Sequence, residues 1–198
     1  FLPIYQQGLN VSILTPSQTP VFLDAGDTLK VKALTRQAER IVLRLNGVEV
    51  TASTSDTLDA AIPLNDIGRH DVEVAAQAQG AERREQFIAM VNPDVTVAGL
   101  PQGVRKGINY VDAATATLVL QAPNKEFVYV IGDFNDWQPG LDYFMNQSPD
   151  GEHWWVTLNN LTPQDIYLFQ YLVDGELRIP DPYADTFYDP AYDDEISV

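Results

Sequence analysis

FVYVIGDFNDW, from Phe127 to Trp137, is the stretch of sequence that decides how the second half of the chain folds. Its first five residues are β-branched or aromatic, which is typical of a buried strand. Gly132 and Asp133 then provide the turn residues that end the strand. Trp137 follows, and its ring can plug the end of a β-sandwich or form a flat platform for a sugar ring. The residues alone favour the plug and leave the platform open.

The rest of the second half consists of short segments with strand composition, and none has the periodicity of an amphipathic helix. Asp174-Gly175 separates the last two segments and predicts a tight hairpin turn between them. The predicted strands are Gly107 to Val111, Thr117 to Ala122, Phe127 to Ile131, Tyr143 to Met145, Trp154 to Leu158, Tyr167 to Val173 and Glu176 to Ile179.

The first half has a similar pattern of short strands, and its clearest local signal is a hairpin within Ile41 to Ser53. Asn46-Gly47 lies between two alternating segments there and readily takes the positive φ angles of a two-residue turn. Leu29, Val31 and Ala33 alternate with polar residues, as in a half-buried strand. The other predicted strands are Val11 to Thr15, Asp27 to Thr35, Leu58 to Leu64, His70 to Gln77 and Glu85 to Val91.

Two runs of about seven strands each predict an all-β protein made of two tandem immunoglobulin-like β-sandwich domains. The prolines and glycines between Asn92 and Gly103 are typical of a domain boundary. We place it near residue 97, with domains at 1–97 and 98–198.

The net charge of the chain indicates which classes of molecule it can bind. The chain has a net charge of −16: residues 1–98 hold 8 Lys and Arg against 12 Asp and Glu, and residues 99–198 hold 4 against 16. This acidity disfavours nucleic acid and anionic membranes as partners and leaves neutral polymers open. The chain has no cysteine, which excludes disulfides and thiolate nucleophiles.

Several motifs of the second half occur together in one known family. Besides GDFNDW, they are GINYVD from Gly107 to Asp112, DGEHWW from Asp150 to Trp155, and YLVDGELRIPDPYAD from Tyr171 to Asp185. Over residues 100–198 the chain resembles carbohydrate-binding module family 48. This is the immunoglobulin-like domain that precedes the catalytic barrel in many α-amylases, branching enzymes and debranching enzymes of glycoside hydrolase family 13.

The resemblance implies a carbohydrate-binding site at Trp137 and Gln170. Glucan-binding members such as the β-subunit of AMP-activated kinase use a tryptophan matching Trp137, a lysine near the position of Gln170, and a second tryptophan near Leu177. Gln170 can still hydrogen-bond sugar hydroxyls, but Leu177 offers no stacking ring. The implied partners are an α-glucan polysaccharide and the catalytic domain of the same parent chain.

The strands place these aromatic residues on particular faces. Adjacent Trp154 and Trp155 must point to opposite sides of a sheet, so at least one belongs to the core. In Tyr167 to Val173, the aromatic residues share one face, and Gln170 points outward if that face is buried.

The sequence predicts no catalytic centre, cofactor or metal site. Glycoside hydrolysis generally needs two carboxyl groups across a cleft, and the barrel that carries them in the resembling enzymes needs roughly 250 residues. The turn contexts of Asp133, Asp136, Asp150 and Asp174 favour local backbone hydrogen bonds instead. We expect His70 and His153 at the surface or at strand ends. The acidic end of the chain, 180–198, is expected to run extended over the surface without the spacing of a calcium loop.

The expected function is therefore that of a non-catalytic N-terminal accessory region of an α-amylase-like enzyme, with weak binding of starch or glycogen. A packing or spacer module without sugar binding, and a complete small adhesin, are the alternatives. The resembling family and the acidity favour an extracellular or periplasmic location.

Overall fold

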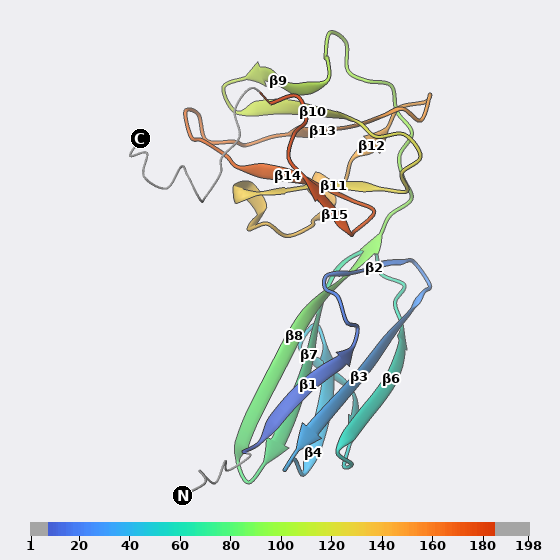
Figure 1. The fold of residues 1–198 in the computed structure, drawn as a ribbon, viewed down its shortest axis with the longest axis vertical. Coiled ribbons are helices and arrows are strands. Elements are labelled where there is room, and N and C mark those ends of the chain that lie inside the picture. The colour runs from blue at the N-terminus through green and yellow to red at the C-terminus, as the bar shows by residue number, and fades with distance from the viewer. Residues whose placement is uncertain (1–7, 185–198) are drawn as a thin grey trace, which may run out of the picture. The chain divides into compact units, whose positions relative to one another are not determined.

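The computed structural model describes residues 8–184, and these residues divide into two compact units, one up to Pro93 (unit 1) and the other from Asp94 onward (unit 2). Each unit consists of strands in two sheets, drawn in Figure 1. Within the described residues, the helical turns are two 3-10 helices of three residues each. The chain is thus all-β, with a β-sandwich in each unit, as the strand pattern predicts.

Unit 1 contains the strands β1 (Asn10–Thr15), β2 (Val21–Asp24), β3 (Thr28–Arg36), β4 (Arg40–Leu45), β5 (Val48–Ser53), β6 (Thr57–Pro63), β7 (Gly68–Ala78) and β8 (Ala81–Asn92). One sheet has the order β1-β3-β6 and the other β2-β8-β7-β4-β5. The short strand β2 was not predicted, because its four residues VFLD show no alternation; it pairs with β8 in parallel.

The core of unit 1 is built by alternating residues, as the sequence predicts. Leu29, Val31 and Ala33 of β3 are buried and pack with Ile41 and Leu43 of β4. The predicted Asn46-Gly47 hairpin joins β4 to β5, with φ of 52° at Asn46 and 79° at Gly47.

His70 is more enclosed than the sequence indicates. It lies near the start of β7 but is buried, with Nε2 2.7 Å from the carbonyl oxygen of Asp66 and Nδ1 3.2 Å from Asn46 Nδ2. Asn46 Oδ1 also accepts the Asp71 N–H. The hairpin asparagine therefore tethers the start of β7, which explains why a histidine can be buried there.

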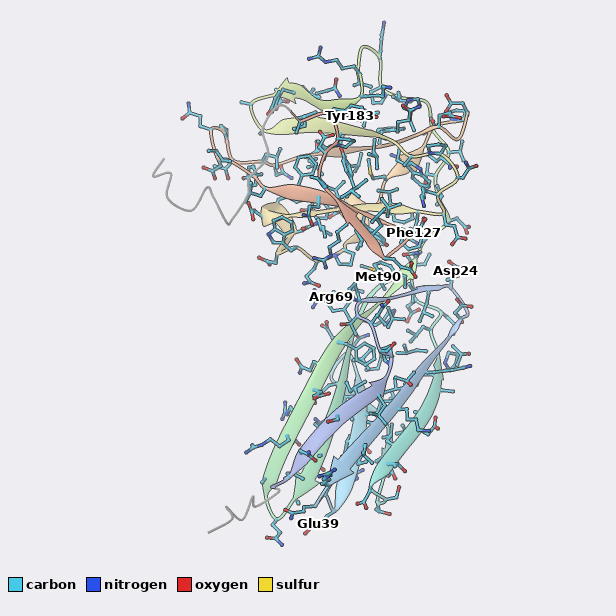
Figure 2. All side chains as sticks on the ribbon, in the orientation of Figure 1. Asp24, Glu39, Arg69, Met90, Phe127 and Tyr183 are labelled. Carbon is cyan, nitrogen blue, oxygen red and sulfur yellow. The ribbon has the colours of Figure 1, made fainter. Side chains whose placement is uncertain are left out.

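Unit 2 contains β9 (Gly107–Asp112), β10 (Thr115–Gln121), β11 (Val128–Gly132), the 3-10 helices η1 (Asp133–Asn135) and η2 (Leu141–Tyr143), β12 (Asn146–Gln147), β13 (His153–Leu158), β14 (Phe169–Val173) and β15 (Leu177–Ile179). The sheets β12-β13-β10-β9 and β11-β14-β15 form two layers (Figure 1). Side chains fill the space between them, as Figure 2 shows.

Two details of unit 2 differ from the predictions. The strand expected at Tyr143 to Met145 is replaced by the end of η2 and a single bridge between Phe144 and Tyr129. The strand expected from Tyr167 begins at Phe169 instead. The two tryptophans follow the prediction: Trp154 is fully buried and Trp155 is half-buried.

The division between the units falls after Pro93, whereas the sequence places it near residue 97. The reason is a set of contacts to Gln147 in unit 2, which pairs with Val97, donates its N–H to the Thr96 carbonyl and accepts the Ala98 N–H. Trp155 Nε1 adds a hydrogen bond of 3.0 Å to the Ala98 carbonyl.

The described start of the C-terminal segment lies on the surface at Pro180, Pro182 and Tyr183, as expected, but one residue of it, Asp181, is buried in unit 2. Asp181 is buried, and its Oδ1 accepts the Tyr183 N–H at 3.1 Å. Burial raises the pKa of the Asp181 carboxyl, and the Tyr183 hydrogen bond only partly opposes this. The rest of the predicted extended segment, with Asp185, Asp189, Asp193 and Asp194, lies outside the described residues.

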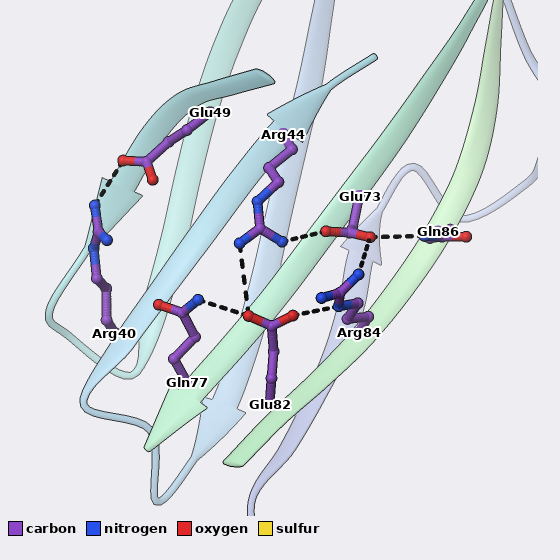
Figure 3. A network of polar contacts seen from close by, with 8 residues as sticks. All are labelled: Arg40, Arg44, Glu49, Glu73, Gln77, Glu82, Arg84 and Gln86. Atoms are coloured by element: carbon purple, nitrogen blue, oxygen red, sulfur yellow. Dashed lines mark hydrogen bonds and ion pairs between the residues drawn. The ribbon is translucent and has the colours of Figure 1, made fainter. Parts of the chain in front are cut away.

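A charged network explains why β8 is longer than the sequence predicts. The run AERREQ is unfavourable in a strand, yet Glu82, Arg84 and Gln86 alternate onto one face of the sheet. There they join Arg44 of β4 and Glu73 of β7 (Figure 3).

Glu73 is at the centre of this network. Its carboxylate pairs with Arg44, lies 3.4 Å from Arg84 Nη1 and accepts the Gln86 amide at 2.7 Å. Burial by itself raises the pKa of Glu73, but these hydrogen bonds and positive charges together outweigh it and lower that pKa. The network therefore stabilises unit 1 above the ordinary Glu pKa of about 4.3 and loses this contribution as the pH falls through the lower folded-state value.

Replacing Glu73 by Gln should lower the free energy of unfolding of unit 1 by about 1–3 kcal/mol at neutral pH, since two arginines lose their shared anion. The difference from the unchanged chain should shrink as the pH falls through the lowered folded-state pKa of Glu73, because the native carboxyl then also becomes neutral. A urea titration followed by the NMR signals of β7 measures both values. Glu49→Gln, at the exposed Arg40–Glu49 pair, is the control, with an expected change of at most about 0.5 kcal/mol. Equal losses for the two variants would contradict this account.

Candidate functional site

The turn that presents Trp137 begins where β11 ends. Gly132 N–H donates to Asn135 Oδ1 at 2.8 Å, and Asn135 Nδ2 donates back to the Val130 carbonyl at 2.9 Å. The Trp137 N–H closes the turn on the Gly132 carbonyl at 2.9 Å. One asparagine side chain thus replaces the ladder hydrogen bonds that the strand loses when it turns.

Asp133 connects this turn to the segment before β14. Its Oδ1 accepts the indole Nε1–H of Trp137 at 2.9 Å, and its Oδ2 accepts the Leu168 N–H at 2.8 Å. The Asp133 N–H also donates to the Leu168 carbonyl at 3.0 Å. A single carboxylate therefore fixes both the indole ring and the neighbouring chain.

Position 132 has room only for glycine. Its φ of −179° is ordinary extended backbone, but an added Cβ would lie 2.4 Å from the Leu168 carbonyl oxygen and 2.9 Å from Phe169 Cβ. No side chain fits at that approach, so the glycine allows the contact between the turn and Leu168.

Trp137 has an unusual backbone conformation. Its φ is 59° and that of Asp136 is 53°, so two consecutive non-glycine residues are in the left-handed region. Such a conformation costs of order 1–3 kcal/mol for a bulky residue and persists only where the surroundings impose it. The ring of Trp137 is half-buried, so complete burial of the tryptophan in the core does not offset the conformational energy of this backbone.

Gln170 lies next to this turn on β14. It pairs with Ile131, the residue before the glycine at which β11 ends. Tyr171 and Val173 belong to the core and Phe169 packs against it, so the alternation places Gln170 on the outer face, half-buried. Gln170 therefore lies on the face turned away from the core, but that face is partly covered, because Ile131 and Leu172 on it are buried. The topology brings Trp137 and Gln170 to the same end of the β11–β14 pair.

Leu177, where the resembling glucan binders have their second tryptophan, is exposed at the start of β15. The strand register pairs it with Val173 of the core side and pairs Arg178 with Leu172. Arg178 is thus the neighbour on the side of Gln170, a position that sequence reasoning did not identify.

Three of the four aspartates predicted to organise turns do so. Besides Asp133, Asp174 Oδ1 accepts the N–H groups of Glu126 and Phe127 at 2.8 and 3.3 Å. Asp150 Oδ1 accepts the Ser148 hydroxyl and the Glu152 N–H, and these two hydrogen bonds lower its pKa. Asp136 is the left-handed residue before Trp137.

Residues 8–184 contain one buried carboxylate, Asp181, and no group of three or more histidines, aspartates and glutamates that could hold a metal. No helix in this part of the chain is long and apolar enough to cross a membrane.

Sequence reasoning also missed an aromatic cluster beside the turn. Phe134 stacks on Tyr143 with ring centroids 5.1 Å apart and lies 6.2 Å from the Tyr167 ring. The three residues come from η1, η2 and the loop before β14, so no single stretch of sequence carries the signal.

Comparisons with known proteins give only distant likenesses. No protein-family model matches the chain, and no curated protein matches its sequence. Among solved structures, the fibronectin(III)-like modules of Clostridium thermocellum CbhA are similar at 13% identity and a TM-score of 0.42, over 86% of this chain and 89% of that one.

Two longer enzyme chains are also similar. β-Glucuronidase 3 of Bacteroides uniformis has 8% identity and a TM-score of 0.37, over 89% of this chain and 25% of that one. A pullulanase from Anoxybacillus sp. LM18-11 has 17% identity and a TM-score of 0.32, over 87% of this chain and 26% of that one. The chain spans about a quarter of the length of these two enzymes. These likenesses carry no argument about function.

Exchanging Asp133 for Asn should destabilise unit 2 by about 1–3 kcal/mol, because the amide oxygen can accept from only one of Trp137 and Leu168 and the NH2 group then faces the donor of the other. All three tryptophans of the chain are in unit 2, so a urea titration followed by tryptophan fluorescence reports on this unit. Asp136→Asn, the same exchange three residues away, should change the stability by less than about 0.5 kcal/mol. If Asp133→Asn left the stability of unit 2 unchanged, the carboxylate would not be what holds the turn.

Proposed function

We propose that the chain is a non-catalytic accessory region of an α-amylase-like glycoside hydrolase and that Trp137 and Gln170 bind α-1,4-glucan weakly. The family 48 motifs in residues 100–198 indicate this class of enzyme. In this proposal the units position a catalytic domain that belongs to the same parent chain.

The observation that carries the sugar-binding part is the strained backbone at Trp137. A tryptophan in the left-handed region, with its indole N–H held by Asp133, is a rigid apolar surface that is only half-buried. Conformational strain concentrates at functional sites, where the surrounding structure maintains it. A ring that is already fixed loses little conformational entropy when a sugar stacks on it.

The chemistry of the site fits a neutral glucan held from one side. An indole face packs against the C–H groups of a pyranose ring, and the Gln170 amide can donate to and accept from hydroxyls. Leu177 adds no second ring, so the affinity should be low. The acidic composition suits a neutral polymer better than a phosphate-bearing one.

The second candidate is a packing module that binds no sugar. It is favoured by the hydrogen bond between the Trp137 indole and Asp133, which leaves the nitrogen edge of the ring no free donor for a hydroxyl. In that case the half-buried ring is the contact surface for the catalytic domain.

Maltoheptaose should bind with a Kd between about 1 μM and 1 mM, measured by calorimetry, and Trp137→Ala should remove the binding at the Trp137 ring. Gln170→Ala should weaken it by roughly three- to tenfold through the loss of hydrogen bonds. Gln102→Ala, at an exposed loop position, is the matched control and should bind like the unchanged chain. If the folded chain gave no heat of binding, the glucan proposal would be rejected and the packing module would remain.

A further inference from the structure

Two adjoining cavities open beside the turn of unit 2. One has a volume of about 500 Å³ and the other about 620 Å³, and both are lined by Phe134, Leu158, Leu161 and Tyr167. Together they form one cleft, here called the Phe134 cleft. Their volumes are in the range of roughly 300–1,000 Å³ that is usual for small-molecule sites. Neither cavity is lined by Trp137 or Gln170.

The aromatic rings of the cleft are fixed in place. The Tyr143 hydroxyl donates to the Phe134 carbonyl at 3.2 Å, which holds the stacked pair. The Tyr167 hydroxyl accepts the Thr162 N–H at 2.8 Å and keeps its own proton for another acceptor. Ordered rings with a free O–H donor are a preorganised surface for a polyhydroxylated ligand.

One side of the cleft carries exposed polar groups, two of which have no protein hydrogen-bond partner. Asp142, Asn159 and Asn160 line the larger cavity and are exposed. Within residues 8–184, Asn159 Nδ2 is 3.3 Å from the Thr157 carbonyl, while the side chains of Asp142 and Asn160 have no hydrogen-bond partner. Carboxylates and carboxamides are suited to the adjacent hydroxyls of a sugar, because each offers two polar atoms side by side.

Charge selects among ligands. Asp112, Asp133, Asp142 and Asp165 line the cleft, and no Lys or Arg is among its lining residues. Phosphates, sulfated glycans and uronic acids would meet only negative charge there, so a neutral ligand is favoured.

We infer that the Phe134 cleft is a second saccharide-binding site that takes a neutral oligosaccharide, separate from the Trp137 platform. The inference rests on the proposed function only for the sugar class, an α-1,4-glucan. A single glucan chain that reached both places would gain avidity over the weak one-sided contact at Trp137.

The two sites can be observed separately in one NMR titration of the ¹⁵N-labelled chain with maltoheptaose. Saturable shifts of the Asn159 and Asn160 side-chain amides would support the cleft, and shifts of the Trp137 indole N–H report the platform. Shifts at Trp137 alone would overturn the cleft and retain the proposed function. Shifts at the asparagines alone would support the cleft and reject sugar binding at Trp137. An unchanged spectrum would reject both binding sites.

Variants test the cleft without the platform. In a Trp137→Ala background, Asn160→Gly should weaken the remaining maltoheptaose binding about five- to tenfold, through the loss of bidentate hydrogen bonds. Asn160 has φ of 61°, which glycine accommodates, and Asn124→Gly at φ of 59° is the matched control outside the cleft. Asp142→Ala provides a second variant with the same expected direction. Equal affinities for Asn160→Gly, Asp142→Ala and the control would overturn the inference.

The charge argument has its own test. An α-1,4-linked galacturonate oligomer should leave the asparagine amides unshifted at concentrations where maltoheptaose shifts them. Equal shifts with the anionic oligomer would contradict selection for a neutral ligand.

Discussion

The architecture around the candidate site depends on the carboxylate of Asp133. Its two oxygens accept hydrogen bonds from the Trp137 indole and from the Leu168 backbone, which belong to segments far apart in sequence. The contact is close enough that only a glycine fits at position 132. Without it, the end of β11 and the approach to β14 would lose their common anchor, and the outer position of Gln170 beside the turn would no longer be defined.

The hydrogen bonds around the turn oppose the conformational energy of its strained backbone. The left-handed conformation at Asp136 and Trp137 costs of order 1–3 kcal/mol per residue, and a hydrogen bond to a charged group contributes about 1.5–3 kcal/mol. The two bonds to Asp133 are exposed to solvent and contribute less than this, so they hold the strained turn only together with the two bonds of Asn135. The same turn places Phe134 against Tyr143, so one local constraint shapes both the Trp137 platform and the adjoining cleft.

The strands and hairpins were predictable because they depend on local patterns. The alternation of β3, the Asn46-Gly47 and Asp174-Gly175 turns, and the opposite faces of Trp154 and Trp155 all follow from neighbouring residues. The length of β8, the burial of His70 and the aromatic cluster at Phe134 were not predictable, because partners from other strands and loops determine them. For the site, sequence identified Trp137 and the outward face of Gln170 but not the strained backbone or the role of Asp133.

The central claim is that the rigid face of Trp137 stacks on a glucan. The most direct measurement is a set of intermolecular nuclear Overhauser effects between the Trp137 indole ring protons and maltoheptaose bound to the complete chain. The account predicts contacts from the ring protons to the C–H groups of a glucose unit, which is the signature of stacking. Bound sugar with contacts elsewhere and none to this ring would contradict it.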